Sequence, residues 1–277
     1  MRFAKYHGIG NDFVMLADPA DDVTLSPETV RALSDRRFGI GADGVIRVAP
    51  GSGGDDLFMD YVNSDGSIGE MCGNGIRCLA LFARAEGMTE REVIRVGTRA
   101  GTKVVRVLDD GRVEVDMGAP IFRAQDVPVA WDGEDALHAK VELAEGVAEV
   151  AALSMGNPHA VLFVDDPDAA PVEDLGPAIE RHPLFPNGTN VEFATVESEE
   201  RVRMRVWERG VGETLACGTG ACAVAVAARV LRGASDRVTV ALPGGELEIA
   251  WSGRPGVDEP VFLTGPATKV FEGEIEL

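Results

Sequence analysis

The sequence predicts a mixed α+β protein of two similar domains, each a curled, mostly antiparallel sheet around a central helix. Three features favour this: a repeat that spans the chain, short strand-like runs separated by turn residues, and two apolar segments that each follow a glycine-rich turn. The length of 277 residues suits two domains of ordinary size, and 45% hydrophobic residues suffice for two cores.

The repeat consists of four motifs that recur in the same order after 145 to 147 residues. A single shared Cys-Gly-x-Gly motif would be unremarkable, but four motifs in register indicate an internal duplication. We therefore expect a pseudo-twofold relation between two halves, with a cleft between them. The paired motifs are 10–11 with 156–157, 37–41 with 184–188, 59–63 with 204–208, and 72–75 with 217–220.

The boundary between the halves is expected at the turn Gly118-Ala119-Pro120. The first domain then comprises residues 1–118 and the second residues 119–262. We expect the remaining segment, residues 263–277, to return to the first domain as a closing strand.

Short alternating or β-branched runs predict the strands, and Gly, Pro, Asp and Asn separate them. Helices are predicted over 76–86 and 221–231, directly after the two Cys-Gly-x-Gly turns. The second helix is apolar all round, so it should be buried on every side, as inside a curled sheet. The clearest strand runs are 93–96, 103–107, 112–116, 201–207, 237–242 and 246–251.

The formal net charge of −20 disfavours nucleic acid and anionic membranes as partners. The N-terminal residues have no apolar signal-peptide core, and the longest uncharged stretch, 214–228, is shorter than the ~20 residues of a membrane span. We expect a cytoplasmic protein that acts on a small molecule.

The four cysteines do not form a metal-binding or disulfide pattern. Neither local pair is a C-x-x-C motif, no histidine cluster lies nearby, and disulfide frameworks belong to short secreted chains. Cys78 and Cys222 lie several residues into the predicted helices and should be inert core residues. Cys72 and Cys217 lie in the two matching turns and are the candidates for chemistry.

A cysteine directly before a helix lies where backbone N–H groups and the helix dipole favour negative charge. That setting should lower the thiol pKa from its free value of about 8.5. It also allows a substrate carboxylate to dock on the backbone N–H groups of Gly73 and Asn74, and of Gly218 and Thr219.

Two such turns facing each other would suit inversion of a stereocentre. One thiol would remove a proton from one face of a carbon, and the other would deliver a proton to the opposite face. A phosphate-binding loop is disfavoured because neither a Walker lysine nor a G-x-G-x-x-G motif is present in the expected setting. An amino-acid-binding module without chemistry and a thiol oxidoreductase are alternatives, but the second would require neighbouring cysteines.

Four segments, 7–13, 71–78, 154–159 and 208–220, resemble the signatures of the diaminopimelate epimerase family. The resemblance spans nearly the whole chain. It implies two similar α/β domains, no pyridoxal phosphate and no metal. It also implies interconversion of LL- and meso-diaminopimelate, a step towards lysine and peptidoglycan precursors, and a homodimer.

The resemblance also assigns roles. Cys72 and Cys217 are the catalytic pair, with Cys217 abstracting and Cys72 donating in the LL-to-meso direction. His159 and Glu208 help to position or tune the thiols. Arg209 suits the distal carboxylate, because its planar fork matches that group. The residues implied to contact substrate are Asn11, Asn63, Gly73, Asn74, Asn157, Asn190, Glu208, Arg209, Gly218 and Thr219.

Proline racemases and hydroxyproline epimerases share the two-thiol logic but require a pocket for a ring, against which Arg209 and the asparagines argue. A phenazine-biosynthesis-type isomerase would share the fold and lack the cysteine pair. One position departs from the resembled pattern: Gly44 stands where many members carry Gln, which leaves any side-chain contact from this site open.

Overall fold

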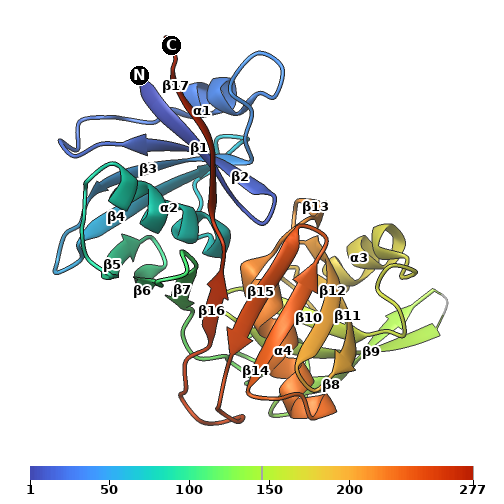
Figure 1. Ribbon diagram of the computed structural model, residues 1–277. Helices are drawn as coiled ribbons and strands as arrows, with labels where there is room; N and C mark the ends of the chain where they lie inside the picture. The colour runs from blue at the N-terminus through green and yellow to red at the C-terminus, as the bar shows by residue number, and fades with distance from the viewer. Residues whose placement is uncertain (145, 277) are drawn as a thin grey trace. The chain divides into compact units, whose positions relative to one another are not determined.

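The computed structural model describes residues 1–144 and 146–276 and forms two compact units. The first comprises Met1–Asp116 with Thr264–Leu277, and the second comprises Met117–Leu263. Each unit is a curved sheet with one long helix on its inner side and a shorter helix on its outer side (Figure 1). Among the described residues, no helix has the length and apolar character needed to cross a membrane.

The sheet of the first unit runs in the order β17-β1-β2-β3-β4-β5-β6-β7. Only the β2–β3 and β4–β5 pairs are parallel, because a helix connects the strands of each pair. The elements are β1 Arg2–Gly8, β2 Asn11–Ala17, α1 Pro27–Ser34, β3 Gly44–Pro50, β4 Leu57–Asn63, α2 Gly73–Ala85, β5 Val93–Thr98, β6 Gly101–Val107, β7 Val113–Asp116 and β17 Thr268–Glu274.

The second unit repeats this plan in the order β8-β9-β10-β11-β12-β14-β15, with β13 paired to β12. Its parallel pairs are β10–β11 and β12–β14. Strand β16, Phe262–Gly265, runs across the boundary between the units. The other elements are β8 Ala136–Leu143, β9 Gly146–Ser154, β10 Pro158–Phe163, α3 Val172–Glu180, β11 Asn190–Ser198, β12 Arg201–Glu208, β13 Gly212–Thr214, α4 Gly218–Arg232, β14 Arg237–Leu242 and β15 Gly245–Ala250.

Strand register gives residue-by-residue equivalence between the units and confirms the repeat. Val45 lies opposite Val62 between β3 and β4, and Val191 lies opposite Trp207 between β11 and β12. At the next position along these strands, Ile46 lies opposite Tyr61 in the first unit and Glu192 lies opposite Val206 in the second. The equivalent positions that matter below are Asn11 and Asn157, Phe13 and His159, Asp43 and Thr189, Gly44 and Asn190, Ile46 and Glu192, Tyr61 and Val206, and Asn63 and Glu208.

Helix α4 contains the apolar run that was expected to lie inside a curled sheet. Every residue over 221–228 is at most 5% exposed, and the helix packs against β9, β10, β11, β12, β14 and β15. Helix α2 is buried against β1, β2, β3, β6 and β7 in the same manner. Gly233 ends α4 in the left-handed conformation (φ 73°), which glycine adopts without steric cost.

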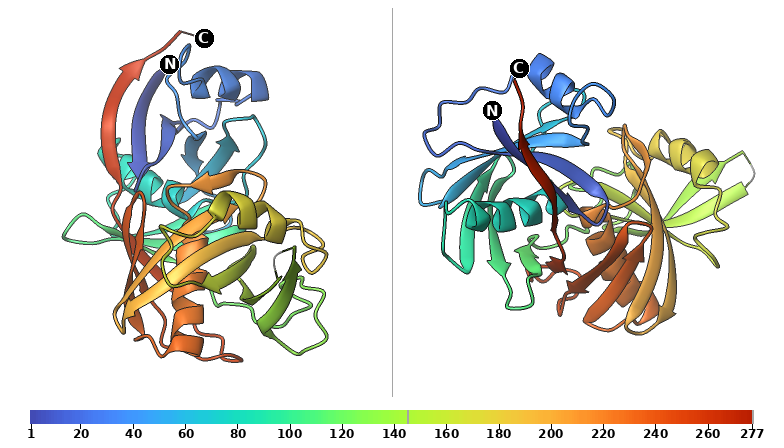
Figure 2. Two further views of the ribbon diagram at one scale, coloured as in Figure 1. Left: turned by 90° about the vertical axis from the view of Figure 1, so that its right-hand side faces the viewer. Right: turned by 45° about the horizontal axis from the view of Figure 1, so that its top comes forward.

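The C-terminal strand β17 pairs antiparallel with β1 (Figure 2). The N-terminal amino group of Met1 donates to the carbonyl oxygen of Ile275 at 2.7 Å, so both ends of the described chain lie at this edge.

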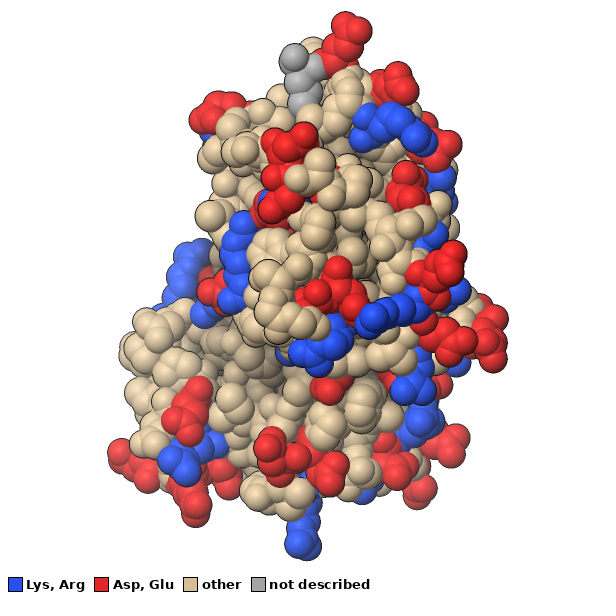
Figure 3. Space-filling view, turned by 90° about the vertical axis from the view of Figure 1, so that its left-hand side faces the viewer, with Lys and Arg blue, Asp and Glu red and all other residues tan. Residues whose placement is uncertain are grey.

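On the face drawn in Figure 3, lysines and arginines lie among acidic side chains. Many arginines are ion-paired, as Arg47 is with Asp18 and Asp60.

Candidate active site

Each candidate cysteine is the N-cap of the long inner helix of its unit. Cys72 (φ −137°, ψ 118°) precedes α2, and Cys217 (φ −128°, ψ 110°) precedes α4. Each sulfur accepts the backbone N–H of the third residue onward, Gly75 or Gly220, at 3.4 Å. The structure therefore confirms that both thiols lie at helix N-termini.

The second glycine of each Cys-Gly-x-Gly turn, Gly75 or Gly220, lies too close to neighbouring side chains to carry a Cβ without a shift of those neighbours. A Cβ on Gly75 would lie 2.6 Å from Ile46 Cδ1, and one on Gly220 would lie 2.8 Å from Glu192 Oε1 and 3.2 Å from Cys217 Sγ. Glycine at these positions thus allows the turn to pack closely against the neighbouring strand. The strand residue beneath is apolar in the first unit and acidic in the second.

In the first unit, Asn11 links the cysteine to the polar residues around it. Its Oδ1 accepts from the Cys72 thiol at 3.6 Å and from Asn74 Nδ2 at 3.2 Å, while its own Nδ2 donates to Asp43 Oδ2 at 2.7 Å. Asn63 accepts from the Tyr61 hydroxyl at 2.6 Å. The structure thus brings Cys72, Asn11 and Asn74 together, as expected from the sequence.

Gly44 has a packing reason for being glycine. A Cβ there would lie 2.7 Å from both Tyr61 Cε2 and the carbonyl oxygen of Val62. Any side chain at this position would require Tyr61 and the β4 backbone to shift. The neighbouring Asp43 supplies the polar contact instead, by accepting from Asn11.

In the second unit, Cys217 is only 5% exposed, and its sulfur lies 3.5 Å from the Thr219 hydroxyl oxygen. The Thr214 hydroxyl donates to Glu208 Oε1. Burial, and then the negative charges of Glu208 and Glu192, raise the pKa of Cys217 well above that of a free thiol. Burial also raises the pKa of Glu208, although its hydrogen bond with Thr214 opposes this.

The expected lowering of the thiol pKa is therefore wrong for Cys217. The helix N-terminus and the N–H of Gly220 do favour the thiolate. Burial and two neighbouring carboxylates outweigh them, because a desolvated thiolate beside negative charge is unfavourable.

Three further residues of the second unit form a buried chain of hydrogen bonds. His159 Nδ1 lies 2.6 Å from Glu192 Oε1, and both side chains are fully buried. His159 Nε2 lies 3.0 Å from Asn157 Oδ1. Glu192 was not among the residues expected from the sequence. An acidic residue between Val191 and Phe193, in the buried first part of β11, is the signal that could have indicated it.

Asn190 connects β10 to the segment that carries Arg209. Its Nδ2 donates to the carbonyl oxygen of Pro158 at 3.0 Å, and its Oδ1 accepts the backbone N–H of Arg209 at 2.9 Å. The Arg209 side chain is exposed and donates to the carbonyl oxygen of Asn187 at 3.2 Å. Within residues 1–144 and 146–276 it has no acidic partner, so its guanidinium is available to a ligand carboxylate.

The other two cysteines are fully buried, and none of the four cysteines forms a disulfide bond with another described residue. Burial raises the pKa of Cys78 to about 12, so it stays protonated at physiological pH. No cluster of three or more potential metal ligands occurs in the described part of the chain.

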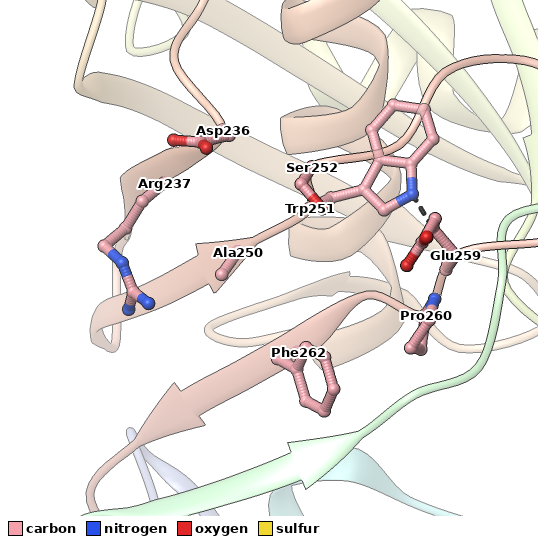
Figure 4. Close-up of a pocket in the computed structure, with 8 residues that line it drawn as sticks. All are labelled: Asp236, Arg237, Ala250, Trp251, Ser252, Glu259, Pro260 and Phe262. Atoms are coloured by element: carbon pink, nitrogen blue, oxygen red, sulfur yellow. Dashed lines mark hydrogen bonds between the residues drawn. The ribbon is translucent and has the colours of Figure 1, made fainter.

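A pocket of about 210 Å³ lies elsewhere in the second unit and contains none of these residues (Figure 4). It is lined by Trp251, whose indole N–H donates to the carbonyl oxygen of Glu259 at 3.1 Å, and by Asp236, which follows the C-terminal end of α4. Cys217 caps the opposite end of that helix, so this pocket is not the candidate active site.

The fold is shared with several isomerases and related enzymes. A PhzF-family phenazine biosynthesis protein from Bacillus anthracis superimposes with a TM-score of 0.73 at 17% identity, over 100% of this chain and 99% of that one. A probable proline racemase from Agrobacterium radiobacter gives 0.71 at 17% identity, over 100% and 93%. A hydroxyproline epimerase from Agrobacterium vitis gives 0.68 at 18%, over 99% and 90%.

At such identities the likeness concerns the fold alone. The sequence comparisons identify the family. The model of the family described as diaminopimelate epimerase matches residues 3–123 and again 151–270, one match in each half. Diaminopimelate epimerase 1 of Nostoc sp. is 49% identical over 99% of both chains. Those of Synechocystis sp. and Acetivibrio thermocellus are 49% and 48% identical over 100% of this chain and 99% of theirs. The chain belongs to the diaminopimelate epimerase family.

Proposed function

We propose that this enzyme interconverts LL- and meso-diaminopimelate by inverting one α-carbon, with Cys72 and Cys217 as the acid and base and without a cofactor. Family membership supports the reaction. The observation that carries the mechanism is the matched placement of the two thiols, each capping a helix N-terminus in the same geometry.

In the proposed step, the thiolate of one cysteine removes the α-proton from one face of the carbon. The electron pair left on the carbon delocalises onto the adjacent carboxylate. The other cysteine, present as a thiol, donates its proton to the opposite face. One C–H bond breaks and one forms, and the two sulfurs exchange protonation states, so the enzyme is ready for the reverse reaction.

The backbone N–H groups of Gly73, Asn74, Gly218 and Thr219 are proposed to bind the carboxylate next to the reacting carbon. First-turn N–H groups have no acceptor within their own helix and are directed towards ligands. They would stabilise negative charge as it develops, which is a large contribution in a desolvated site. The mechanism requires the two units to bring both turns to one substrate molecule.

Cys217 needs a proton acceptor before it can act as a base, since its thiol pKa is raised. We propose Glu208, whose negative charge acts on that thiol and whose own pKa is raised by burial. A carboxyl group with a raised pKa is better matched to a thiol than an exposed one would be.

The distal amino-acid end of the substrate is proposed to bind Arg209, Asn63, Asn157 and Asn190, with Asn11 near the reacting carbon. The exposed guanidinium of Arg209 suits the distal carboxylate. Asn190 fixes the backbone of Arg209. We also propose that the enzyme is a cytoplasmic homodimer, which the family resemblance supports, and light scattering on the purified protein tests its mass in solution.

The test is to incubate the purified protein with LL-diaminopimelate, without pyridoxal phosphate, and to resolve the isomers by chiral chromatography. Appearance of the meso isomer is expected. L-Proline and trans-4-hydroxy-L-proline serve as control substrates and should remain unchanged. Turnover of a cyclic substrate without turnover of diaminopimelate would contradict the proposal.

A further inference from the structure

We propose that Glu192 is a positioning residue for substrate recognition: through His159 it holds the Asn157 amide with its carbonyl turned inward, so that the Asn157 N–H groups face the ligand. This inference rests on the proposed function for the identity of the substrate. It assigns a role to a buried acid that the catalytic proposal does not use.

The first step is the protonation of His159. Asn157 Oδ1 can only accept, so the hydrogen bond of 3.0 Å requires a proton on His159 Nε2. The contact of 2.6 Å between Nδ1 and Glu192 Oε1 requires a second proton shared by those two atoms. Glu192 and His159 together therefore carry no net charge, whichever of them holds the shared proton.

The second step is the rigidity of this pair. Both side chains are fully buried, and Glu192 Oε2 has no hydrogen-bond partner in residues 1–144 and 146–276. If His159 rotated away, Glu192 would become a buried acid with neither oxygen paired, which is strongly unfavourable. The carboxyl group also lies against the first turn of α4, 2.8 Å from where a Cβ of Gly220 would be. The imidazole is thereby fixed.

The third step is the orientation of Asn157. Its carbonyl oxygen accepts a hydrogen bond from the fixed imidazole, so its amide nitrogen is the end available to bind a ligand. That nitrogen makes no hydrogen bond within the described residues, and the side chain is half-buried. Asn157 therefore presents two donors and recognises a hydrogen-bond acceptor.

The equivalent asparagine of the first unit has the reverse orientation. The nitrogen of Asn11 is held by Asp43, and its oxygen accepts from the Cys72 thiol and from Asn74. Phe13 and Ile46 occupy the places of His159 and Glu192, so no relay exists there. The relay is thus specific to the second unit.

The neighbours of Asn157 indicate the kind of acceptor. The next residue, Pro158, accepts from Asn190, which in turn holds the backbone of Arg209. Asn157 is therefore one peptide bond away from a carbonyl that Asn190 ties to the backbone of Arg209. The exposed guanidinium carried on that backbone, together with the donors of Asn157, suits a carboxylate. The ligand group that Asn157 binds is therefore a carboxylate of the substrate.

The test compares Glu192→Ile, which installs the residue of the first unit, with Glu192→Gln, whose amide N–H can donate to Nδ1 of neutral His159 and so leave the proton on Nε2. The matched control is Ile46→Val. Glu192→Ile should raise KM on the order of tenfold or more, with a smaller effect on kcat. Glu192→Gln and the control should stay within about threefold of the parent. Circular dichroism confirms that each variant is folded.

A double-variant cycle separates positioning from general destabilisation. If Glu192 acts through Asn157, Glu192→Ile adds no further rise in KM to Asn157→Ala. Multiplying effects on KM, or a loss confined to kcat, would overturn the proposal. Nitrogen-15 NMR of His159 gives a readout independent of turnover. Nε2 should be protonated in the parent protein, and a deprotonated Nε2 would overturn the relay even if no epimerisation is found.

Discussion

The two cysteine turns have nearly the same backbone and very different surroundings. Their N-cap dihedrals differ by less than ten degrees, and each sulfur accepts a glycine N–H at the same distance. Around Cys72 the supporting strands carry Phe13, Ile46 and Asn63. At the equivalent positions around Cys217 they carry ionisable side chains, namely His159, Glu192 and Glu208.

The two halves thus share the backbone geometry of the turn, while the side chains around the cysteine differ between them. The proposed mechanism needs two thiols of similar placement, because each would have to reach the same carbon. It does not need them to have the same environment. Cys72 is half-buried beside an amide, whereas Cys217 is buried beside carboxylates that raise its pKa.

The largest expected effect comes from removing either thiol. Cys72→Ala and Cys217→Ala should each abolish epimerisation, by at least about three orders of magnitude, because neither remaining thiol can serve both faces. Initial rates with LL-diaminopimelate measure this. Cys78→Ala, a buried thiol one turn into α2, is the control and should retain activity. A variant that lacks Cys72 or Cys217 and still epimerises well would contradict the claim that both thiols are required.

The next effect concerns Glu208, which stands where the first unit has Asn63. Glu208→Gln should lower kcat by about two orders of magnitude, since Cys217 loses its proton acceptor. The variant should also be more stable than the parent at neutral pH. Because burial raises the pKa of Glu208, the buried carboxyl group favours folding below its unfolded pKa and loses that contribution as pH rises through its folded pKa.

The melting temperatures of Glu208→Gln and the parent should therefore diverge as pH rises from 4 to 8, with the variant higher. Asn63→Asp, measured in parallel, introduces an acid at the equivalent position of the first unit. Equal melting temperatures of Glu208→Gln and the parent at every pH would show that the Glu208 carboxylate is not destabilised by burial.

A smaller effect is expected from an added methyl group in each turn. Gly75→Ala would press on the ends of Ile46 and Met59, which are flexible, whereas Gly220→Ala would press on Glu192 and Cys217. Both should destabilise the fold by about 1–3 kcal/mol, and Gly220→Ala should lower kcat more. Denaturant unfolding and steady-state kinetics separate the two. A larger loss of kcat in Gly75→Ala than in Gly220→Ala would contradict the expectation that the second turn is the more sensitive one.

The repeat, the two inner helices and the helix-capping cysteines could be predicted because they depend on local sequence. A Cys-Gly-x-Gly turn before an apolar run specifies its own helix start. The partners of the cysteines could not be predicted in this way. Glu192 meets His159, and Asp43 meets Asn11, through pairing of strands about thirty residues apart. The direction of the Cys217 pKa likewise depends on burial and on carboxylates brought in by folding.

The most direct test of the two-thiol mechanism is the early reaction in deuterium oxide, starting from LL-diaminopimelate. If Cys72 and Cys217 act on opposite faces, the incoming hydron comes from a thiol already equilibrated with solvent. Mass spectrometry should then find one deuterium in the first meso product and almost none in the recovered LL substrate. Protium at the inverted carbon of the early product would mean that a single base serves both faces, and would contradict the account.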